Sequence, residues 1–139
     1  MNKSYQVIRE IVLDWSHMDL LGHVNNVHYF TFIQGNRIQF FDSLGMGQLH
    51  PEMEQGPIVA KTSCSFKFAL HFPDTIQVRS FIQKLGNSSV IIEHHIFNGK
   101  NELSAIAEDV VVLYNFKKGE KIALSEEVKA QLLALRPAL

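Results

Sequence analysis

The apolar residues near the start of the chain follow a period of two. Between Tyr5 and Leu13 they alternate with polar residues over much of the segment. Such alternation is typical of a β-strand with one buried face. The sequence therefore predicts a first strand that ends near residues 14–17.

A longer apolar segment follows, and its pattern differs. Its apolar residues cover most of the circumference of a helix, namely Tyr29, Phe30, Phe32, Ile33, Ile38, Phe40, Phe41 and Leu44. A helix that is apolar nearly all round is a buried one. Asn25 or Asn26 is its expected N-cap, and Gly45 is its expected C-terminal stop.

Beyond this helix the pattern returns to a period of two. Residues 45–57, rich in Gly, Pro and Met, are expected to form a loop. We then predict four strands joined by tight turns, over residues 59–70, 76–82, 90–97 and 103–116. Asn98-Gly99 is a strong hairpin signal, because both residue types tolerate a positive φ. Ser125 is expected to cap a short amphipathic helix that ends near Leu135.

These elements define an α+β fold. A strand and a buried helix precede four strands in sequence, and an antiparallel five-stranded sheet curled around the helix would bury it. The short C-terminal helix completes this arrangement. With 139 residues and 46% hydrophobic content, we expect one domain over residues 1–139.

Charge and composition exclude several kinds of partner. The net charge is −1 and no basic block occurs, so we expect neither nucleic acid nor an anionic membrane as a partner. No apolar run approaches the roughly 18 residues of a membrane span. The first residues lack an apolar signal region, and a single cysteine rules out an internal disulfide. We therefore expect a soluble cytoplasmic protein.

The candidate catalytic residues lie just before the predicted long helix. Asp19, His23, Asn25 and Asn26 lie within eight residues of one another. Asp19 alone is most simply a turn residue, and either asparagine is a good N-cap. However, a carboxylate beside free first-turn amides is also suited to acyl transfer, because the amides stabilise an oxyanion. His23 would then orient the substrate or the carboxylate, or bind a leaving thiolate.

Other kinds of site find little support. The seven histidines match no zinc pattern, and His94 and His95 should point to opposite faces of a strand, so no metal is expected. Cys64 lies on the same face of its predicted strand as several apolar residues, which predicts a buried and unreactive thiol. No Gly-x-Ser-x-Gly elbow and no glycine-rich phosphate loop occurs, and no cofactor is expected.

The segment Asp19-Leu-Leu-Gly-His-Val-Asn-Asn-Val-His-Tyr-Phe, followed by Arg37-Ile-Gln-Phe-Phe, resembles a known family. It is similar to the 4-hydroxybenzoyl-CoA thioesterase-like family of hotdog-fold acyl-CoA thioesterases. The resemblance covers about residues 6 to 116, including Phe66 to Val78 and Gly86 to Ser89. It implies a hotdog fold and hydrolysis of an acyl-CoA thioester.

The resemblance also implies roles for individual residues. Asp19 matches the catalytic carboxylate, as nucleophile or general base, and the backbone amide of Asn26 matches the group that polarises the thioester carbonyl. His23 is placed with them in the catalytic set. Five further residues are substrate-binding candidates on the same basis: Gly22, Asn25, Tyr29, Ser88 and Ser89. Similar proteins form homodimers or homotetramers with the active site at the subunit boundary.

Two departures from the family pattern matter for the mechanism. Many relatives carry a helix glutamate where this chain reads Gln34-Gly35-Asn36, so a second carboxylate is missing. Gly35 inside a helix costs roughly 1 kcal/mol relative to Ala, which predicts close packing or room for substrate. Some relatives carry a basic cluster where this chain has Gly86-Asn87-Ser88. Other groups must then hold the phosphates of coenzyme A, or the carrier is acyl carrier protein.

Three functions follow from the sequence. The leading hypothesis is an acyl-CoA thioesterase. The first alternative is a non-catalytic domain that binds acyl thioesters on the same fold. The second is a thioesterase that acts on acyl carrier protein.

Overall fold

The computed structural model describes residues 4–46 and 52–137. The chain folds as β1 (Val7–Val12), the 3-10 turn η1 (Trp15–His17), α1 (Asn26–Asp42), β2 (Gln55–Phe66), β3 (Thr75–Leu85), β4 (Ser89–Phe97), β5 (Leu103–Asn115), β6 (Glu120–Lys121) and α2 (Glu126–Ala134). This confirms the predicted α+β hotdog fold. A two-residue sixth strand, β6, is added to the five that were expected.

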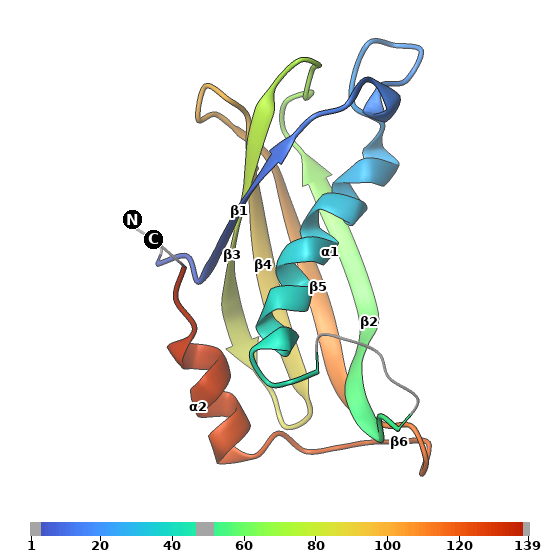
Figure 1. Cartoon of the computed structure of the whole chain (residues 1–139), viewed down its shortest axis with the longest axis vertical. Helices are drawn as coiled ribbons and strands as arrows, with labels where there is room; N and C mark the ends of the chain where they lie inside the picture. Colours follow the sequence, from blue (N-terminus) through green and yellow to red (C-terminus); the bar gives the residue numbers. More distant parts are fainter. Residues whose placement is uncertain (1–3, 47–51, 138–139) are drawn as a thin grey trace.

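The sheet is antiparallel throughout, in the order β1-β3-β4-β5-β2, with β6 paired to β5. It curves around α1, which lies along its concave face (Figure 1). The strand β2 forms one edge of the sheet, so one side of its backbone has no neighbouring strand among the described residues. Within the described residues, no helix is long and apolar enough to cross a membrane.

Both helices begin where the sequence predicted. The side chain of Asn25 caps α1 by accepting a hydrogen bond from the Val27 amide at 3.0 Å. The side chain of Ser125 caps α2 by accepting from the Val128 amide at 3.1 Å. The helix α1 ends at Asp42, and Gly45 follows with a φ of +75°.

Two details of the strands differ from the prediction. The strand β2 starts at Gln55, four residues earlier than expected, because its first residues pair with the end of β5. The hairpin between β4 and β5 forms as predicted, but its positive φ of 62° belongs to Asn101 rather than to Asn98 or Gly99. Residues 47–51 of the predicted loop lie outside the described residues.

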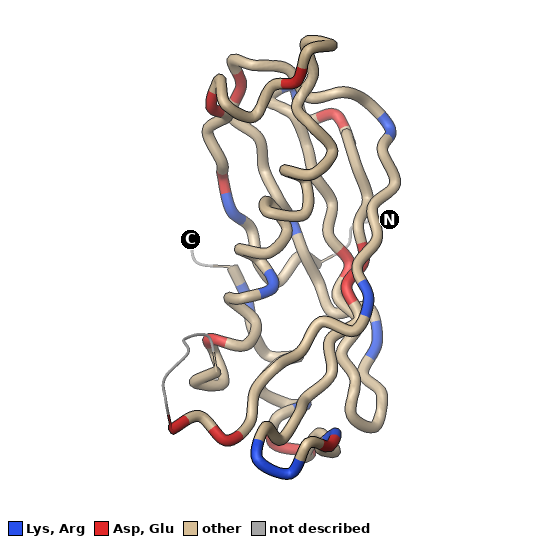
Figure 2. Tube along the Cα trace, turned by 90° about the vertical axis from the view of Figure 1, so that its right-hand side faces the viewer, with Lys and Arg blue, Asp and Glu red and all other residues tan. Residues whose placement is uncertain are grey.

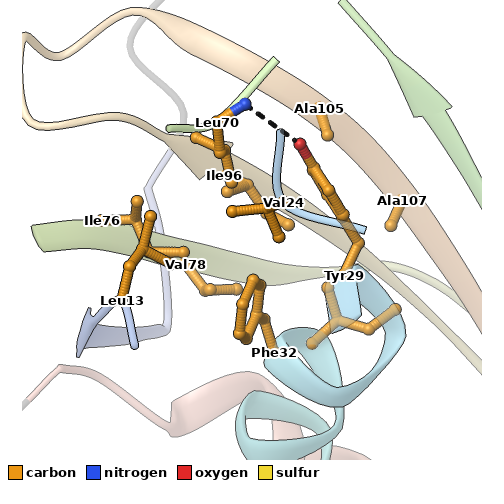
Figure 3. Close-up of a cluster of buried hydrophobic side chains, with 11 residues drawn as sticks. Leu13, Val24, Tyr29, Phe32, Leu70, Ile76, Val78, Ile96, Ala105 and Ala107 are labelled. Atoms are coloured by element: carbon orange, nitrogen blue, oxygen red, sulfur yellow. Dashed lines mark hydrogen bonds between the residues drawn. The ribbon is translucent and has the colours of Figure 1, made fainter. Parts of the chain in front are cut away.

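Two apolar clusters fill the space between α1 and the sheet. The first surrounds the N-terminal half of α1 and includes Tyr29, Phe32, Ile33 and Leu70 (Figure 3). The second surrounds its C-terminal half and includes Phe40 and Phe41. Cys64 packs against the first cluster, and burial raises the pKa of its thiol to about 11. The raised pKa agrees with the predicted low reactivity of this thiol, but Cys64 is half-buried rather than fully buried.

A buried polar network runs between the two clusters. The Asn36 side chain donates to the Ser80 hydroxyl at 2.8 Å, and that hydroxyl lies 2.6 Å from Nδ1 of His94. The other ring nitrogen of His94 lies 2.9 Å from Asp109, to which Arg37 also donates at 2.9 Å. Asn36 and Arg37 thereby connect α1 to three strands of the sheet.

Every member of this network except Arg37 is fully buried. Burial lowers the pKa of His94, so its ring stays neutral. Burial would raise the pKa of Asp109, but the hydrogen bonds from His94, then Thr62 and Arg37, together outweigh it and lower that pKa. Since an ionised carboxylate only accepts, a neutral His94 donates from Nε2 to Asp109 and accepts from Ser80 at Nδ1.

The glycine inside α1 has a packing reason. A Cβ at position 35 would overlap the guanidinium of Arg9, which extends from β1 across the helix. Gly35 therefore allows close packing, one of the two roles predicted from the sequence.

Candidate active site

The segment from Asp19 to Val24 folds into a tight turn against the sheet. The Asp19 amide donates to the His23 carbonyl at 2.8 Å, and Met18 and Val24 form an isolated bridge. Gly22 has a φ of +80°, with nothing within 4 Å of the position its Cβ would take. This glycine is thus required by the backbone conformation rather than by space.

The carboxylate of Asp19 stabilises this turn. Its Oδ1 accepts from the amide of Leu21 at 2.8 Å and from that of His23 at 3.4 Å. The side chain is half-buried, so it keeps contact with solvent. Its second oxygen accepts no hydrogen bond within residues 4–46 and 52–137. Asp19 is therefore a turn residue, as its residue type suggests, and also a carboxylate with one oxygen left for chemistry.

The start of α1 supplies a donor beside it. Asn25 caps the Val27 amide, and the His28 amide donates to the Asn25 carbonyl at 3.0 Å. Among the described residues nothing accepts a hydrogen bond from the Asn26 amide, although it lies in the positive first turn of the helix. The backbone of Asn25 is itself fixed by donation to the His17 carbonyl at 2.9 Å.

These groups share one open cavity of about 280 Å³. Its lining includes Asp19, His23, Asn26 and Tyr29, together with Phe66 to Ala69 at and after the end of β2. The structure thus brings together all three predicted catalytic residues and one predicted substrate-binding residue. A carboxylate, an imidazole and a helix N-terminus are groups that attack on an acyl carbonyl can use, as base or nucleophile and as donors to an oxyanion.

Tyr29 forms the floor of this cavity. Tyr29 is 3% exposed, and its ring meets that of Phe66 edge to face at 4.9 Å. Its hydroxyl accepts from the Leu70 amide at 3.3 Å, as Figure 3 shows. Burial raises the pKa of this hydroxyl. Tyr29 therefore shapes the cavity as a neutral side chain.

His23 lies at the exposed rim of the cavity. Its ring meets that of His71 edge to face at 5.0 Å, and Nδ1 of His71 lies 3.2 Å from the Gly22 carbonyl. His71 was not predicted from the sequence, because it is 48 residues away from His23 along the chain. Gly22 and Asn25 act here through their backbone and capping roles.

Ser88 and Ser89 lie elsewhere. Ser88 belongs to the turn between β3 and β4, where its carbonyl accepts from the Leu113 amide at 3.1 Å, and Ser89 begins β4. That turn is beside the C-terminal end of α1, whereas Asp19 precedes its N-terminal end (Figure 1). A single chain therefore does not bring these serines to the candidate site.

No group of three or more His, Cys, Asp or Glu side chains within the described part of the chain is placed to hold a metal ion. The buried network of Asn36, Ser80, His94 and Asp109 was missed by sequence analysis. Its signal is present in the sequence, since Ser80, His94 and Asp109 occupy inward positions of strands that are otherwise apolar there. It lies beneath α1 and is closed to substrate.

Comparisons with known proteins identify the family of this chain. The family model described as the thioesterase-like superfamily matches residues 13–132. The uncharacterized protein YsmA of Bacillus subtilis is 23% identical over 133 residues, which are 96% of this chain and 89% of that protein.

Two solved structures illustrate the likeness in fold. A thioesterase of Thermus thermophilus, complexed with coenzyme A and zinc, is 23% identical and superposes with a TM-score of 0.78 over 94% of this chain and 100% of that one. A DHNA-CoA thioesterase of Staphylococcus aureus is 19% identical, with a TM-score of 0.77 over 93% of each chain. The matched family model covers most of the chain, so this protein belongs to the thioesterase-like superfamily and is a hotdog-fold thioester hydrolase.

Proposed function

We propose that this protein hydrolyses an acyl-CoA thioester to a free acid and coenzyme A. The observation that carries the proposal is the shared cavity of Asp19 and Asn26, which sets a carboxylate beside an unoccupied helix N-terminal amide. The related Thermus thermophilus thioesterase, which is complexed with coenzyme A, supports this choice of carrier.

In the proposed mechanism the thioester carbonyl lies against the Asn26 amide. That donor stabilises the negative charge that develops on the carbonyl oxygen. The free oxygen of Asp19 either attacks the carbonyl carbon or removes a proton from an attacking water. The thiolate of coenzyme A then leaves, and His23, which lines the cavity, stabilises it. When water attacks, this step gives the free acid directly. When Asp19 attacks, an anhydride between the acyl group and Asp19 remains, and water hydrolyses it to the free acid and the restored carboxylate. The helix glutamate of many relatives has no part here, because this chain reads Gln34-Gly35-Asn36 in that segment and has no carboxylate there.

We also propose that the active unit contains two copies of the chain. Large apolar side chains are exposed on the β2 edge and on the outward face of α1, among them Val27 (62%), Ile38 (42%), Val59 (39%) and Phe66 (48%). The helix was predicted to be buried nearly all round, and a second chain would cover its exposed face. Edge strands are rarely left open, and pairing two β2 strands about a two-fold axis satisfies both backbones.

This dimer would supply an acyl site. A mainly apolar cavity of about 310 Å³ lies near the C-terminal end of α1, lined by Phe41, Met46, Met53, Val59 and Phe116 among others. Antiparallel pairing of two β2 strands brings this cavity of one chain toward the Asp19 cavity of the other. We propose that it receives the acyl group. Sedimentation equilibrium should then give twice the chain mass of 15.8 kDa.

A panel of acyl-CoA thioesters tests the function. Free coenzyme A is measured with a thiol reagent for aliphatic and aromatic acyl groups, and binding is measured in parallel by calorimetry. Turnover of at least one member supports the proposal. Tight binding without turnover across the panel would instead support a non-catalytic binding domain. Turnover of thioesters of acyl carrier protein, with none of acyl-CoA, would show that the carrier is acyl carrier protein.

A further inference from the structure

A basic turn connects β5 to β6. Lys117, Lys118 and Lys121 are all exposed and lie within five residues (Figure 2). The turn has a defined shape, because the Asn115 side chain accepts from the amides of Lys117 at 3.0 Å and Lys118 at 2.9 Å. Gly119 adopts a φ of +67°, and its amide donates to the Asn115 carbonyl at 2.9 Å.

Two of these three lysines are available to a ligand. Lys117 pairs with Glu54 at 2.7 Å. Neither Lys118 nor Lys121 forms an ion pair within residues 4–46 and 52–137. Glu120 precedes Lys121 on β6, so the two side chains point to opposite faces of that strand. The turn therefore presents two uncompensated cations to solvent.

The turn adjoins the beginning of β2. Gln55 pairs with Asn115, and the Phe116 amide donates to the Glu54 carbonyl at 2.8 Å. Within one chain this places the turn at the end of β2 that is farther from Asp19. When two β2 strands pair antiparallel about a two-fold axis, however, the beginning of one lies opposite the end of the other.

The end of β2 leads directly into the candidate active site. Phe66, Lys67 and Phe68 line the Asp19 cavity. The basic turn of one subunit is therefore beside the Asp19 cavity of its partner in the proposed dimer. Lys67 is itself a cation at that cavity, so both subunits contribute positive charge around it.

We propose that Lys118 and Lys121 of one subunit bind the phosphate groups of coenzyme A whose thioester lies in the Asp19 cavity of the other. This inference rests on the proposed function and the proposed dimer. Lysine recognises phosphate as a flexible point charge, which suits a nucleotide held at the surface. The turn at Gly86 to Ser89 contains no lysine or arginine, so it cannot provide this charge.

The first test changes the charge of the turn. We expect K118E/K121E to raise the KM for an acyl-CoA about tenfold at low salt, because two charged contacts to phosphate are lost. The effect should shrink as salt is added. The ratio of kcat/KM for the acyl-CoA to that for the matching N-acetylcysteamine thioester, which has no phosphate, should fall by a similar factor. The control K84E/K129E changes the net charge equally at sites away from this turn.

The second test asks whether the lysines act across the dimer. Two differently tagged chains are co-expressed, one Asp19→Asn and the other K118E/K121E, and the mixed dimer is isolated. Its intact Asp19 lies in the chain with the altered turn. A trans arrangement restores the wild-type KM at that site, whereas lysines acting within their own chain leave KM raised.

Three results would overturn the inference. They are an unchanged KM for K118E/K121E, an equal loss with the N-acetylcysteamine thioester, and a mixed dimer that keeps the raised KM. Calorimetric binding of coenzyme A alone to wild type and K118E/K121E separates this inference from the proposed function. Wild type that binds coenzyme A through these lysines but hydrolyses nothing would refute the proposed function and leave the phosphate site standing.

Discussion

The buried network gives the sharpest prediction about stability. Replacing Asp109 with Asn keeps the shape of the side chain but removes its charge. Arg37, whose side chain is only 18% exposed, then loses its charged partner at 2.9 Å. Arg37 and His94 both donate to the same oxygen, Oδ2, so an asparagine whose amide oxygen takes that place still accepts both hydrogen bonds. The substitution therefore removes the negative charge that faces the guanidinium of Arg37, while the shape of the site is kept.

The loss of unfolding free energy is set by the unpaired charge of Arg37 that remains. Removing one partner of a buried ion pair costs about 3–5 kcal/mol, because the other charge stays desolvated. Arg37 retains some contact with solvent, so we expect about 3 kcal/mol, at the lower end of that range. For a chain of this length that corresponds to a fall in Tm of roughly 10 °C.

Urea denaturation at pH 7 measures this change, with Asp42→Asn as the control at an exposed position of α1, the helix that carries Arg37. Asp42→Asn should change the free energy of unfolding by less than about 0.5 kcal/mol. The midpoint for Asp109→Asn should fall while its m-value is unchanged. If Asp109→Asn unfolds at the same urea concentration as Asp42→Asn, the ion pair does not stabilise the fold as described.

The remaining predictions concern the turn, the helix start and pH. Gly22→Ala should cost about 1–2 kcal/mol of unfolding free energy, because residue 22 has a positive φ, and no loss would show that the turn relaxes freely. Asn25→Ala should cost about 1 kcal/mol through loss of the N-cap, measured by urea midpoint, and a neutral result would mean that water replaces the cap. Burial lowers the pKa of His94, so its contribution to stability is present above its ordinary pKa and is lost as pH falls through the folded value. Below about pH 6.5, the free energy of unfolding should therefore fall more steeply with falling pH in wild type than in His94→Gln, by up to about 1.4 kcal/mol per pH unit. Parallel curves of unfolding free energy against pH for the two proteins would contradict this.

Much of the fold was predictable because its signals are local. The period-two strands, the apolar segment of α1 and the caps Asn25 and Ser125 each depend on neighbours in sequence. The candidate site was predictable for the same reason. Asp19, His23 and Asn26 come from one continuous segment, so their meeting needs no knowledge of tertiary structure.

What was missed depends on long-range contacts. Ser80, His94 and Asp109 come from three strands and meet only through the register of the sheet. His71 reaches His23 through a turn that follows β2. The role of Gly35 depends on the side chain of Arg9, which crosses from another element. In the proposed dimer a second chain covers the exposed faces of α1 and β2, and no pattern within one chain specifies that contact.

The central claim is that Asp19 carries the hydrolysis beside the Asn26 amide. Asp19→Asn tests it most directly, because asparagine keeps the Oδ1 that accepts from the Leu21 amide and so preserves the turn. For an acyl-CoA that wild type hydrolyses, we predict that kcat falls by about 10²–10⁴-fold, while Tm is unchanged within error. Equal rates of coenzyme A release by the two proteins would contradict the account.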